Sequence, residues 1–391
     1  WLPRGPRPGR RLAPLPLRPA RRRSGLSGTS TPQGPGYAKL PPVPATVYSA
    51  RLGAIADSQF DAALARAGLG RFVAAAAPSG GLFGQNVYLT STTGEFVFRG
   101  APHWYQGGPN DAWQFPKERL YADLLHHHTR APVAWPQILD DSGEHFPWPY
   151  LIMPRLPGAS LADPGELEAL APDERLDIAR ALGEALAGLH ALAWPFSGDF
   201  DPTVQGLVPY DGGYRAHLSG EVRRLRDEGR HGGLLTTEDA GWLNTLLAAD
   251  AATPEPDGGT YIHNDYHLGN VLLARQGANG HAEPRWTVTG VVDLMTSAFG
   301  DPAADLVRLT CTFLDRDPPC AGAFLAAYRA AGGPARPGEP RLALLVAYER
   351  LLIWSYFKRP DVDADWLKGQ AFNAWTRRYT DRLALLLSAK D

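Results

Sequence analysis

The segment Tyr261–Ala274, which reads YIHNDYHLGNVLLA, constrains this chain more than any other part of it. It spaces His263, Asp265 and Asn270 in the pattern H-x-D-x-x-x-x-N, and the apolar run 271–274 follows directly. A three-residue pattern occurs by chance in roughly a few per cent of chains of this length, so the neighbouring residues must support it. The segment predicts a polar loop that leads into a strand.

The residues after this strand predict a β-hairpin. A polar, glycine-containing turn at 276–284 separates the strand from a second apolar run at 286–292, which ends in Asp293. The two ends of such a hairpin bring Asn270 and Asp293 together. Magnesium prefers oxygen ligands and keeps several waters, so the amide and the carboxylate predict a magnesium site. The alternative is that Asp293 merely ends a strand, as aspartate often does.

The spacing of His263, Asp265 and Asn270 resembles the catalytic loop of protein-kinase-like phosphotransferases. The resemblance implies that Asp265 is the catalytic residue, which orients the acceptor hydroxyl and accepts its proton late. Aspartate is ordinarily ionised at neutral pH, which suits that role. Asn270 and Asp293 are then expected to hold the magnesium ion, and His263 is expected to fix the loop rather than transfer protons.

The residues that follow Asp293 narrow the resemblance. Protein kinases place Phe-Gly after the metal-binding aspartate, whereas this chain has Leu-Met and, further on, a G-D-P-x-x-D segment at 300–305. This arrangement is similar to the aminoglycoside phosphotransferase and choline kinase group, fructosamine kinases included. The resemblance implies that Asp305 is structural and braces the catalytic loop. Asp301, which precedes a proline, is expected to cap the next helix.

The same resemblance implies an α+β, protein-kinase-like fold with two lobes, a small β-rich N-lobe and a larger helical C-lobe. We expect residues 1–45 to form a Pro/Arg-rich tail and residues 46–154 to form the N-lobe, with a nucleotide-binding sheet and a helix. Residues 155–391 are expected to form the helical C-lobe with the catalytic loop and acceptor pocket. Apolar residues at helical spacing over 172–192 and 339–357 agree with that expectation.

Residues 80–100 predict a hairpin that covers the nucleotide phosphates. Gly84 and two glycines before it would let backbone N–H groups approach phosphate oxygens, although glycines also serve ordinary loops. Arg99 ends the hairpin where kinases usually carry lysine, and its guanidinium can bind phosphate or carboxylate oxygens through two donors. Lys117 is a possible substitute for this cation.

Two further residues complete the predicted nucleotide site. Pro116 suits the first position of a helix, and Glu118 in its first turn is expected to orient Arg99; a solvated helix-start glutamate is the alternative. The short apolar strand at 150–153 is followed by proline and glycine, which predicts the connection between the lobes. Backbone groups near Met153 would then bond the adenine, unless the segment is an ordinary strand exit.

Composition limits the possible partners and location. The first 33 residues hold eight arginines and no acidic residue, and their Pro/Arg-rich composition predicts disorder. The tail is interpreted either as an arm for nucleic acid or a membrane surface, or as a translated upstream stretch without function. Because only this tail suggests such binding, neither nucleic acid nor membrane is expected as a partner. No apolar segment is long enough to span a bilayer. The two cysteines, Cys311 and Cys320, lack metal-ligand spacing, and a reducing cytoplasm is the expected location.

Acidic and aromatic residues of the C-lobe are candidates for the wall of the acceptor pocket. They are Asp315, Asp317, Trp354, Tyr356, Asp361, Asp363, Asp365 and Trp366. Carboxylates beside aromatic rings could hold an amine through charge and cation–π attraction. A solvated acidic loop in front of aromatic core helices is the alternative.

The sequence is therefore interpreted as an ATP-dependent (or other NTP-dependent), magnesium-dependent small-molecule kinase, a phosphotransferase with an alcohol group as acceptor. The expected substrate is the hydroxyl of an amino sugar, an aminoglycoside or a similar compound. A non-catalytic nucleotide-binding regulator of kinase shape is the alternative, which Arg99 allows and which Asp265, Asn270 and Asp293 argue against. The sequence does not choose between ATP and GTP and does not predict the oligomeric state.

Overall fold

The computed structural model describes residues 45–78, 84–100, 113–277, 284–358, 367 and 369–388. Almost all of the expected tail lies outside these residues, as do Gly80 and Gly81. The chain divides into two compact units. The smaller unit extends to Phe115 and includes Gln137–Arg155, and the larger unit takes Pro116–Pro136 and the chain from Leu156 on.

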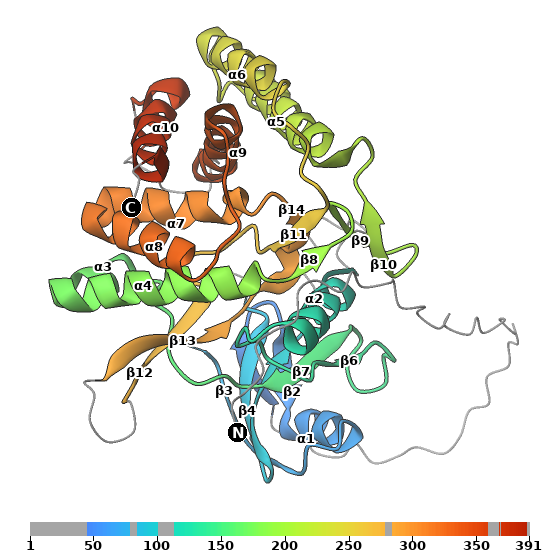
Figure 1. The fold of residues 1–391 in the computed structure, drawn as a ribbon. Helices are drawn as coiled ribbons and strands as arrows, with labels where there is room; N and C mark the ends of the chain where they lie inside the picture. Colours follow the sequence, from blue (N-terminus) through green and yellow to red (C-terminus); the bar gives the residue numbers. More distant parts are fainter. Residues whose placement is uncertain are drawn as a thin grey trace, which may run out of the picture. The chain divides into compact units, whose positions relative to one another are not determined.

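The smaller unit is built around an antiparallel sheet of five strands in the order β3-β4-β5-β7-β6. Its elements are β1 (Ala45–Ser49), β2 (Gly53–Ala56), α1 (Asp57–Arg66), β3 (Phe72–Ala76), β4 (Asn86–Ser91), β5 (Gly94–Arg99), β6 (Ile138–Asp140) and β7 (Tyr150–Pro154). The predicted phosphate hairpin is present as β4 and β5, with Asn86 opposite Arg99. Figure 1 shows β1, β2 and α1 in blue, the first part of the sequence that the structure describes.

Aromatic packing holds the smaller unit together. Phe60 of α1 is fully buried and meets the rings of Tyr48, Phe72, Phe98 and Phe146 at centroid distances of 5.2–6.2 Å. Aromatic pairs at these distances add to the free energy gained by burying apolar area. The alternation of buried and partly exposed residues along β4 places one face of the sheet on this core.

The helix α2 (Gln114–His128) begins two residues before Pro116, where the sequence placed its start. Proline is tolerated there because the first four N–H groups of a helix have no partner within the helix. The expected ranges put this helix with the N-lobe sheet, whereas the structure groups all but its first two residues with the larger unit. Tyr121 explains this grouping, because its buried ring packs on Tyr261 and Phe299 of that unit.

The helices of the larger unit form its bulk. They are α3 (Pro164–Glu168), α4 (Pro172–Leu189), α5 (Gly213–His231), α6 (Thr237–Asp250), α7 (Ala303–Arg316), α8 (Pro318–Ala330), α9 (Glu339–Phe357) and α10 (Phe372–Ser388). Helices α4, α7 and α8 stack in layers, and α9 lies beside α10 (Figure 1). Gly183 permits the tight crossing of α4 and α8, since a Cβ there would lie 2.3 Å from the carbonyl oxygen of Phe324.

The larger unit also contains strands, and of these the sequence analysis predicted only the two that form the hairpin over residues 271–292. Its five-stranded sheet has the order β10-β9-β14-β11-β8, and a separate two-stranded ladder joins β12 and β13. These strands are β8 (Ala193–Trp194), β9 (Gly198–Asp201), β10 (Gly206–Pro209), β11 (Gly259–Ile262), β12 (Val271–Gln276), β13 (Arg285–Val291) and β14 (Ala298–Gly300). The mixed composition of sheet unit and helical unit confirms the α+β, two-lobed fold class.

Two further features of the described part of the chain concern membrane-spanning helices and disulfide bonds. None of its helices is both long enough and apolar enough to cross a membrane. Cys311 and Cys320 are buried free thiols, and burial raises the pKa of each to about 12. Both are therefore protonated and poorly nucleophilic at neutral pH.

Candidate functional site

Two antiparallel ladders bring the polar loops of the larger unit together. The pair β11–β14 aligns Tyr261 with Phe299, and the pair β12–β13 aligns Val271 with Val291. The loop that joins β11 to β12 carries the H-x-D-x-x-x-x-N pattern, and the loop that joins β13 to β14 begins with the residues around Asp293. Because both ladders close on these loops, the loops meet at one end of the β12–β13 hairpin.

Asn270 and Asp293 stand at that end. Asn270 directly precedes β12, and Asp293 follows β13 by one intervening residue. The N–H of Val292, next to Asp293, donates to the carbonyl oxygen of Asn270 at 3.0 Å. The hairpin expected from the sequence is therefore present, and it brings the backbones of the two predicted magnesium ligands side by side.

The carboxylate of Asp265 contacts side chains through both oxygens. The amide Nδ2 of Asn270 donates to its Oδ2 at 2.8 Å and to the backbone oxygen of Asp265 at 3.0 Å. The guanidinium of Arg308 forms an ion pair with Oδ1, and Nε2 of His267 lies 3.5 Å from Oδ2. The side chain of Asp265 keeps 24 % of its surface exposed, so a small molecule can still reach it.

Arg308 of α7 and Glu349 of α9 belong to this site, and the sequence analysis did not identify either. Nε of Arg308 donates to Glu349 Oε1 at 2.7 Å, and Arg350 donates to Oε2 at 2.6 Å. The two guanidinium groups outweigh burial and lower the pKa of Glu349, which is therefore ionised. A signal existed for Arg308, because it follows Asp305 by three residues and such residues share one helix face.

Asp305 holds the backbone of the catalytic loop through hydrogen bonds, as the resemblance implied. Its buried carboxylate accepts the backbone N–H groups of His263 at 2.6 Å and of Asn264 at 2.7 Å. Nε2 of His190 donates to the same carboxylate at 3.1 Å, and Nδ1 of His190 bonds the hydroxyl of Tyr328. A buried carboxylate with three donors fixes the backbone immediately before Asp265.

His263 ties the two loops together. Its Nε2 donates to the carbonyl oxygen of Val292 at 3.0 Å, so Nδ1 is the atom that accepts the N–H of Asp265 at 3.3 Å. Burial lowers the pKa of His263, which keeps the ring neutral at neutral pH. A neutral ring with both nitrogens engaged is suited to a structural role, in line with the expectation for this residue.

The backbone turns sharply at Asn264 and at Asp293, whose φ angles are 61° and 64°. Asn and Asp are the residues with side chains that best tolerate this left-handed region. Nδ2 of Asn264 donates to the carbonyl oxygen of Thr296, and the hydroxyl of Thr296 donates to the backbone carbonyl oxygen of His263. Strained backbone held by such bonds on both loops is common at functional sites.

The residues present fit a magnesium ion. Since Nδ2 of Asn270 donates to Asp265, the oxygen Oδ1 is the atom of this amide that a cation would contact. Asp293 supplies a carboxylate close enough to influence the charge of His263 and His267. The described residues contain no group of three or more His, Cys, Asp or Glu side chains placed to hold a metal. One carboxylate and one amide oxygen suit magnesium that takes its other ligands from phosphates and water.

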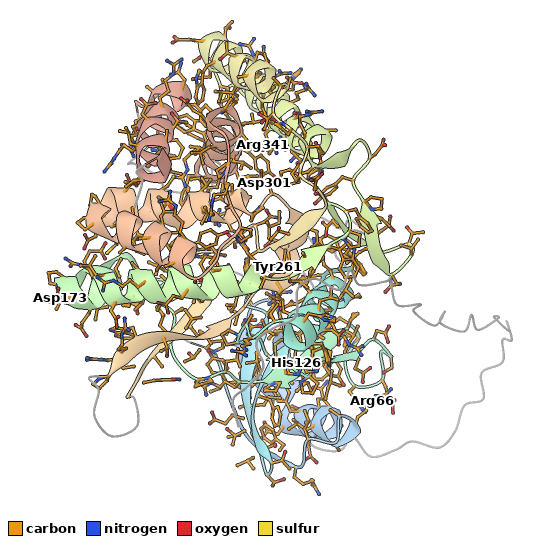
Figure 2. The ribbon with its side chains drawn as sticks, viewed as in Figure 1. Arg66, His126, Asp173, Tyr261, Asp301 and Arg341 are labelled. Carbon is orange, nitrogen blue, oxygen red and sulfur yellow. The ribbon has the colours of Figure 1, made fainter. Side chains whose placement is uncertain are left out.

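Asp301 caps the start of α7 and joins a buried ion-pair cluster. Its Oδ1 accepts the N–H of Ala303 at 3.0 Å, as expected from the sequence. Its Oδ2 lies 3.3 Å from Arg341, which is almost fully buried and also pairs with Asp250 at 2.7 Å. Figure 2 shows Asp301 and Arg341 next to each other. Burial raises the pKa of Asp301, and the helix N–H and Arg341 oppose that shift.

In the smaller unit, three of the predicted nucleotide-site residues lie along neighbouring strands. Gly84 precedes β4 with φ of 58°, and its carbonyl accepts the hydroxyl of Ser49 at 2.6 Å. A Cβ at Gly84 would lie 2.9 Å from Ser49, so glycine alone fits. Arg99 ends β5 with only 8 % of its surface exposed, and Met153 on β7 pairs with Val97 of β5.

The other predicted nucleotide-site residue, Glu118, is buried on α2 in the larger unit. Its neighbour Lys117 donates to Asp199 Oδ2 at 2.8 Å, and Tyr121 donates to the other oxygen of Asp199. Burial lowers the pKa of Lys117, and Asp199 opposes that shift. Lys117, the possible substitute for Arg99, therefore has a carboxylate partner within its own unit.

The proposed acceptor wall is only partly described. Asp317 pairs with Arg175 at 2.6 Å, and Asp315 accepts the hydroxyl of Tyr379 at 2.6 Å. Trp354 is buried and donates its indole N–H to a backbone carbonyl, which is the behaviour of a core residue. The remaining candidates apart from Tyr356 lie outside the described residues: Asp361, Asp363, Asp365 and Trp366.

A sheet unit with a glycine-led hairpin, together with a helical unit that carries an H-x-D-x-x-x-x-N loop, defines the class of protein-kinase-like folds. Comparison with known proteins agrees with this class. The model of the phosphotransferase enzyme family matches residues 75–345, well over half of the chain. The chain therefore belongs to the phosphotransferase enzyme family.

Solved structures resemble the chain at low sequence identity. A candidate aminoglycoside phosphotransferase from Ralstonia eutropha JMP134 is 19 % identical, with a TM-score of 0.53 over 84 % of this chain and 95 % of that one. The GDP complex of an aminoglycoside 2'-phosphotransferase-IIIa mutant is 18 % identical, with a TM-score of 0.49 over 83 % and 93 % of the chains. A ternary complex of APH(4)-Ia with ADP and hygromycin B is 16 % identical, with a TM-score of 0.47 over 84 % and 98 %. No curated protein matches the sequence.

Proposed function

We propose that the chain transfers the γ-phosphoryl group of ATP, or of another nucleoside triphosphate, to a hydroxyl group of a small molecule. Amino sugars, aminoglycosides and similar compounds are the first candidates for the acceptor. The observation that carries the proposal is the set of contacts among Asp265, Asn270 and the end of the hairpin at Asp293. These contacts support the proposal, in which Asp265 orients the nucleophile and Asn270 and Asp293 supply oxygen ligands suited to magnesium.

In this proposal each side chain has a separate task. Asp265 bonds the acceptor hydroxyl and takes its proton as the new phosphorus–oxygen bond forms and the bond to the leaving diphosphate breaks. Asn270 and Asp293 would hold magnesium, which supplies positive charge to the phosphate oxygens. Arg99, Glu118, the backbone at Gly84 and the backbone near Met153 are the groups we assign to the nucleotide.

Asp305 and His263 support this reaction without touching the reactants. Their bonds hold the backbone of the loop, so Asp265 requires little further ordering when the substrates bind. Groups held in advance avoid a reorganisation cost during phosphoryl transfer, in which positioning and electrostatic stabilisation provide most of the catalysis.

A panel assay tests the proposal. Purified protein with magnesium and γ-labelled ATP or GTP is offered amino sugars, aminoglycosides, choline-like alcohols, macrolides and ketosamines, and labelled product is measured. Asp265→Asn keeps the volume of the side chain and removes its charge, so turnover should fall by about 10²- to 10⁴-fold while nucleotide affinity changes little.

Asp227→Asn is the matched control, because Asp227 is exposed on α5 and its carboxylate pairs only with its neighbour Arg226 among the described residues. It should turn over like the wild type. Equal turnover in Asp265→Asn and wild type would contradict the catalytic role. Nucleotide binding without any transfer or hydrolysis would favour a regulator of kinase shape.

A further inference from the structure

The ion pair between Arg308 and Asp265 bears on the choice of acceptor. If Asp265 orients the acceptor hydroxyl, as proposed above, any group that contacts Asp265 lies beside the reacting end of the acceptor. Arg308 is such a group, since its Nη1 pairs with Oδ1 of Asp265 and its side chain is 22 % exposed. The acceptor hydroxyl would therefore lie beside a positive charge, that of Arg308, as well as the negative charge of Asp265.

Glu349 fixes the direction of Arg308. It accepts Nε at 2.7 Å, and it is itself held by Arg350, which stacks against the rings of Trp375 and Tyr379. A guanidinium is planar and carries five N–H donors in a rigid arrangement. Once Nε and Nη1 are engaged, the direction of the third nitrogen, Nη2, is fixed as well.

The Nη2 nitrogen of Arg308 carries two N–H groups that can donate hydrogen bonds. Among the residues that the structure describes, it makes no hydrogen bond, although the other two nitrogens of Arg308 are each paired with a carboxylate. Its two N–H groups suit an oxygen atom of the acceptor, and an oxyanion would bind more strongly than a hydroxyl. An ammonium group placed there would instead meet the positive charge of Arg308.

The carboxylates nearby do not offset this preference. Asp265 pairs with Arg308, and Glu349 pairs with both Arg308 and Arg350. In the described part of the chain, neither carboxylate that contacts Arg308 is therefore available to an ammonium group without displacing an arginine.

We propose that Arg308 selects acceptors by the group beside the reacting hydroxyl. The carbon adjacent to the one that bears this hydroxyl should carry oxygen, as a hydroxyl or carboxylate, rather than an ammonium group. This inference rests on the proposed phosphotransfer at Asp265 and narrows its acceptor class to polyhydroxy compounds of neutral or acidic character at that position. Amines elsewhere in the acceptor remain compatible with it. Glu349 acts as a positioning residue, because it reaches the acceptor only through Arg308.

Two matched substrate sets test the proposal. The first is glycerol, glycerate and 2-amino-1,3-propanediol, and the second is ethylene glycol, glycolate and ethanolamine. Within each set the members differ in charge beside a hydroxyl. With magnesium and γ-labelled ATP, the wild type should show kcat/KM at least about ten-fold higher for the neutral or acidic member than for the amine.

Variants of Arg308 separate selection from a structural role. Arg308→Gln should reduce the preference, and Arg308→Glu should reverse it in favour of the amines. Arg223→Gln, an exposed arginine on α5, should keep the wild-type ranking. A general loss of stability would lower kcat/KM for all members alike and would leave the ranking unchanged. An unchanged ranking in both Arg308 variants therefore overturns the proposal.

The remaining outcomes are also decisive. A wild-type preference for the amines, or transfer to no member of either set by a protein that hydrolyses ATP, overturns the inference about Arg308 and leaves the phosphotransferase proposal standing. A wild type that neither binds magnesium-ATP in calorimetry nor hydrolyses it overturns the proposed function itself, and the inference falls with it.

Discussion

The catalytic-loop region of the larger unit and the core of the smaller unit are held by different forces. Around Phe60 the smaller unit packs aromatic rings, whereas the loop that carries Asp265 is held by buried hydrogen bonds to Asp305 and His263. Apolar packing is non-directional and adds stability, while hydrogen bonds to a buried carboxylate set directions and lose much of their gain to desolvation. The smaller core therefore provides stability, and the polar loop provides geometry.

Removing a ring from the aromatic core should have the largest effect on stability. Phe60→Ala should lower the free energy of unfolding of the smaller unit by about 3–5 kcal/mol, because it removes buried area and leaves a cavity. Denaturant titration followed by tryptophan fluorescence measures the change. Val73→Ala, at an exposed position of β3, is the control and should stay within about 0.5 kcal/mol. An effect of Phe60→Ala below about 1 kcal/mol would contradict the role given to this core.

Replacing Asp305 tests whether hydrogen bonds to this buried carboxylate hold the loop that carries Asp265. Asp305→Ala leaves the N–H groups of His263 and Asn264 and the ring of His190 without their acceptor, at a cost of about 3–5 kcal/mol. Asp305→Asn retains one oxygen acceptor and should cost less. The same denaturant titration reports both values. If the alanine variant is as stable as the asparagine variant, the carboxylate does not brace the loop.

Replacing the second predicted magnesium ligand should alter binding more than stability. Asp293→Asn removes the charge but keeps a residue that tolerates φ of 64°. We expect the affinity for magnesium with a non-hydrolysable ATP analogue to fall by at least about ten-fold. Calorimetry with and without magnesium measures this, and the affinities without the ion should agree between variant and wild type. A variant with wild-type affinity in magnesium would exclude Asp293 as a ligand.

The smallest effect concerns pH. Burial lowers the pKa of His263, His267 and His217 below the ordinary value of 6.5. The unfolded chain therefore binds protons below about pH 6.5 that the folded chain does not, and stability falls as pH drops from there toward the folded pKa values. Each histidine contributes a slope of up to about 1.4 kcal/mol per pH unit.

His263→Gln should remove one of these contributions while its amide can still donate to Val292. Unfolding free energies measured between about pH 5 and pH 7 should then vary less steeply than in the wild type. The aromatic core contains no comparable group among its described residues, so Phe60→Ala should lower stability without changing the slope. Equal slopes in His263→Gln and wild type would mean that His263 does not stay neutral in the fold.

Local patterns explain which parts were predictable. Buried and partly exposed residues alternate along β4, which made the hairpin over residues 80–100 predictable, and the apolar run that ends at Asp293 made β12–β13 predictable. The small strands of the larger unit carried no such signal. Strand β8 has two residues and β14 has three, too few for a period to be recognised, and their partners lie far along the chain.

The start of α2 was placed two residues late for a related reason. Pro116 was interpreted as the first helical position, but the unpaired N–H groups of the first turn make several positions acceptable for proline. The assignment of this helix to a unit depends on Tyr121, whose partners Tyr261 and Phe299 are more than a hundred residues away. Sequence spacing does not encode such contacts.

The resemblance to a known family implied the α+β two-lobed fold class. By itself, the sequence determined the two hairpins and the placing of Asp265, Asn270 and Asp293 around a common end, because these features follow from local periods and short spacings between neighbours in the chain. Only the tertiary structure decided that Arg308 would sit on Asp265 and be held there by Glu349. That arrangement arises because α7 and α9 pack beside each other, and the packing of distant helices depends on the whole core.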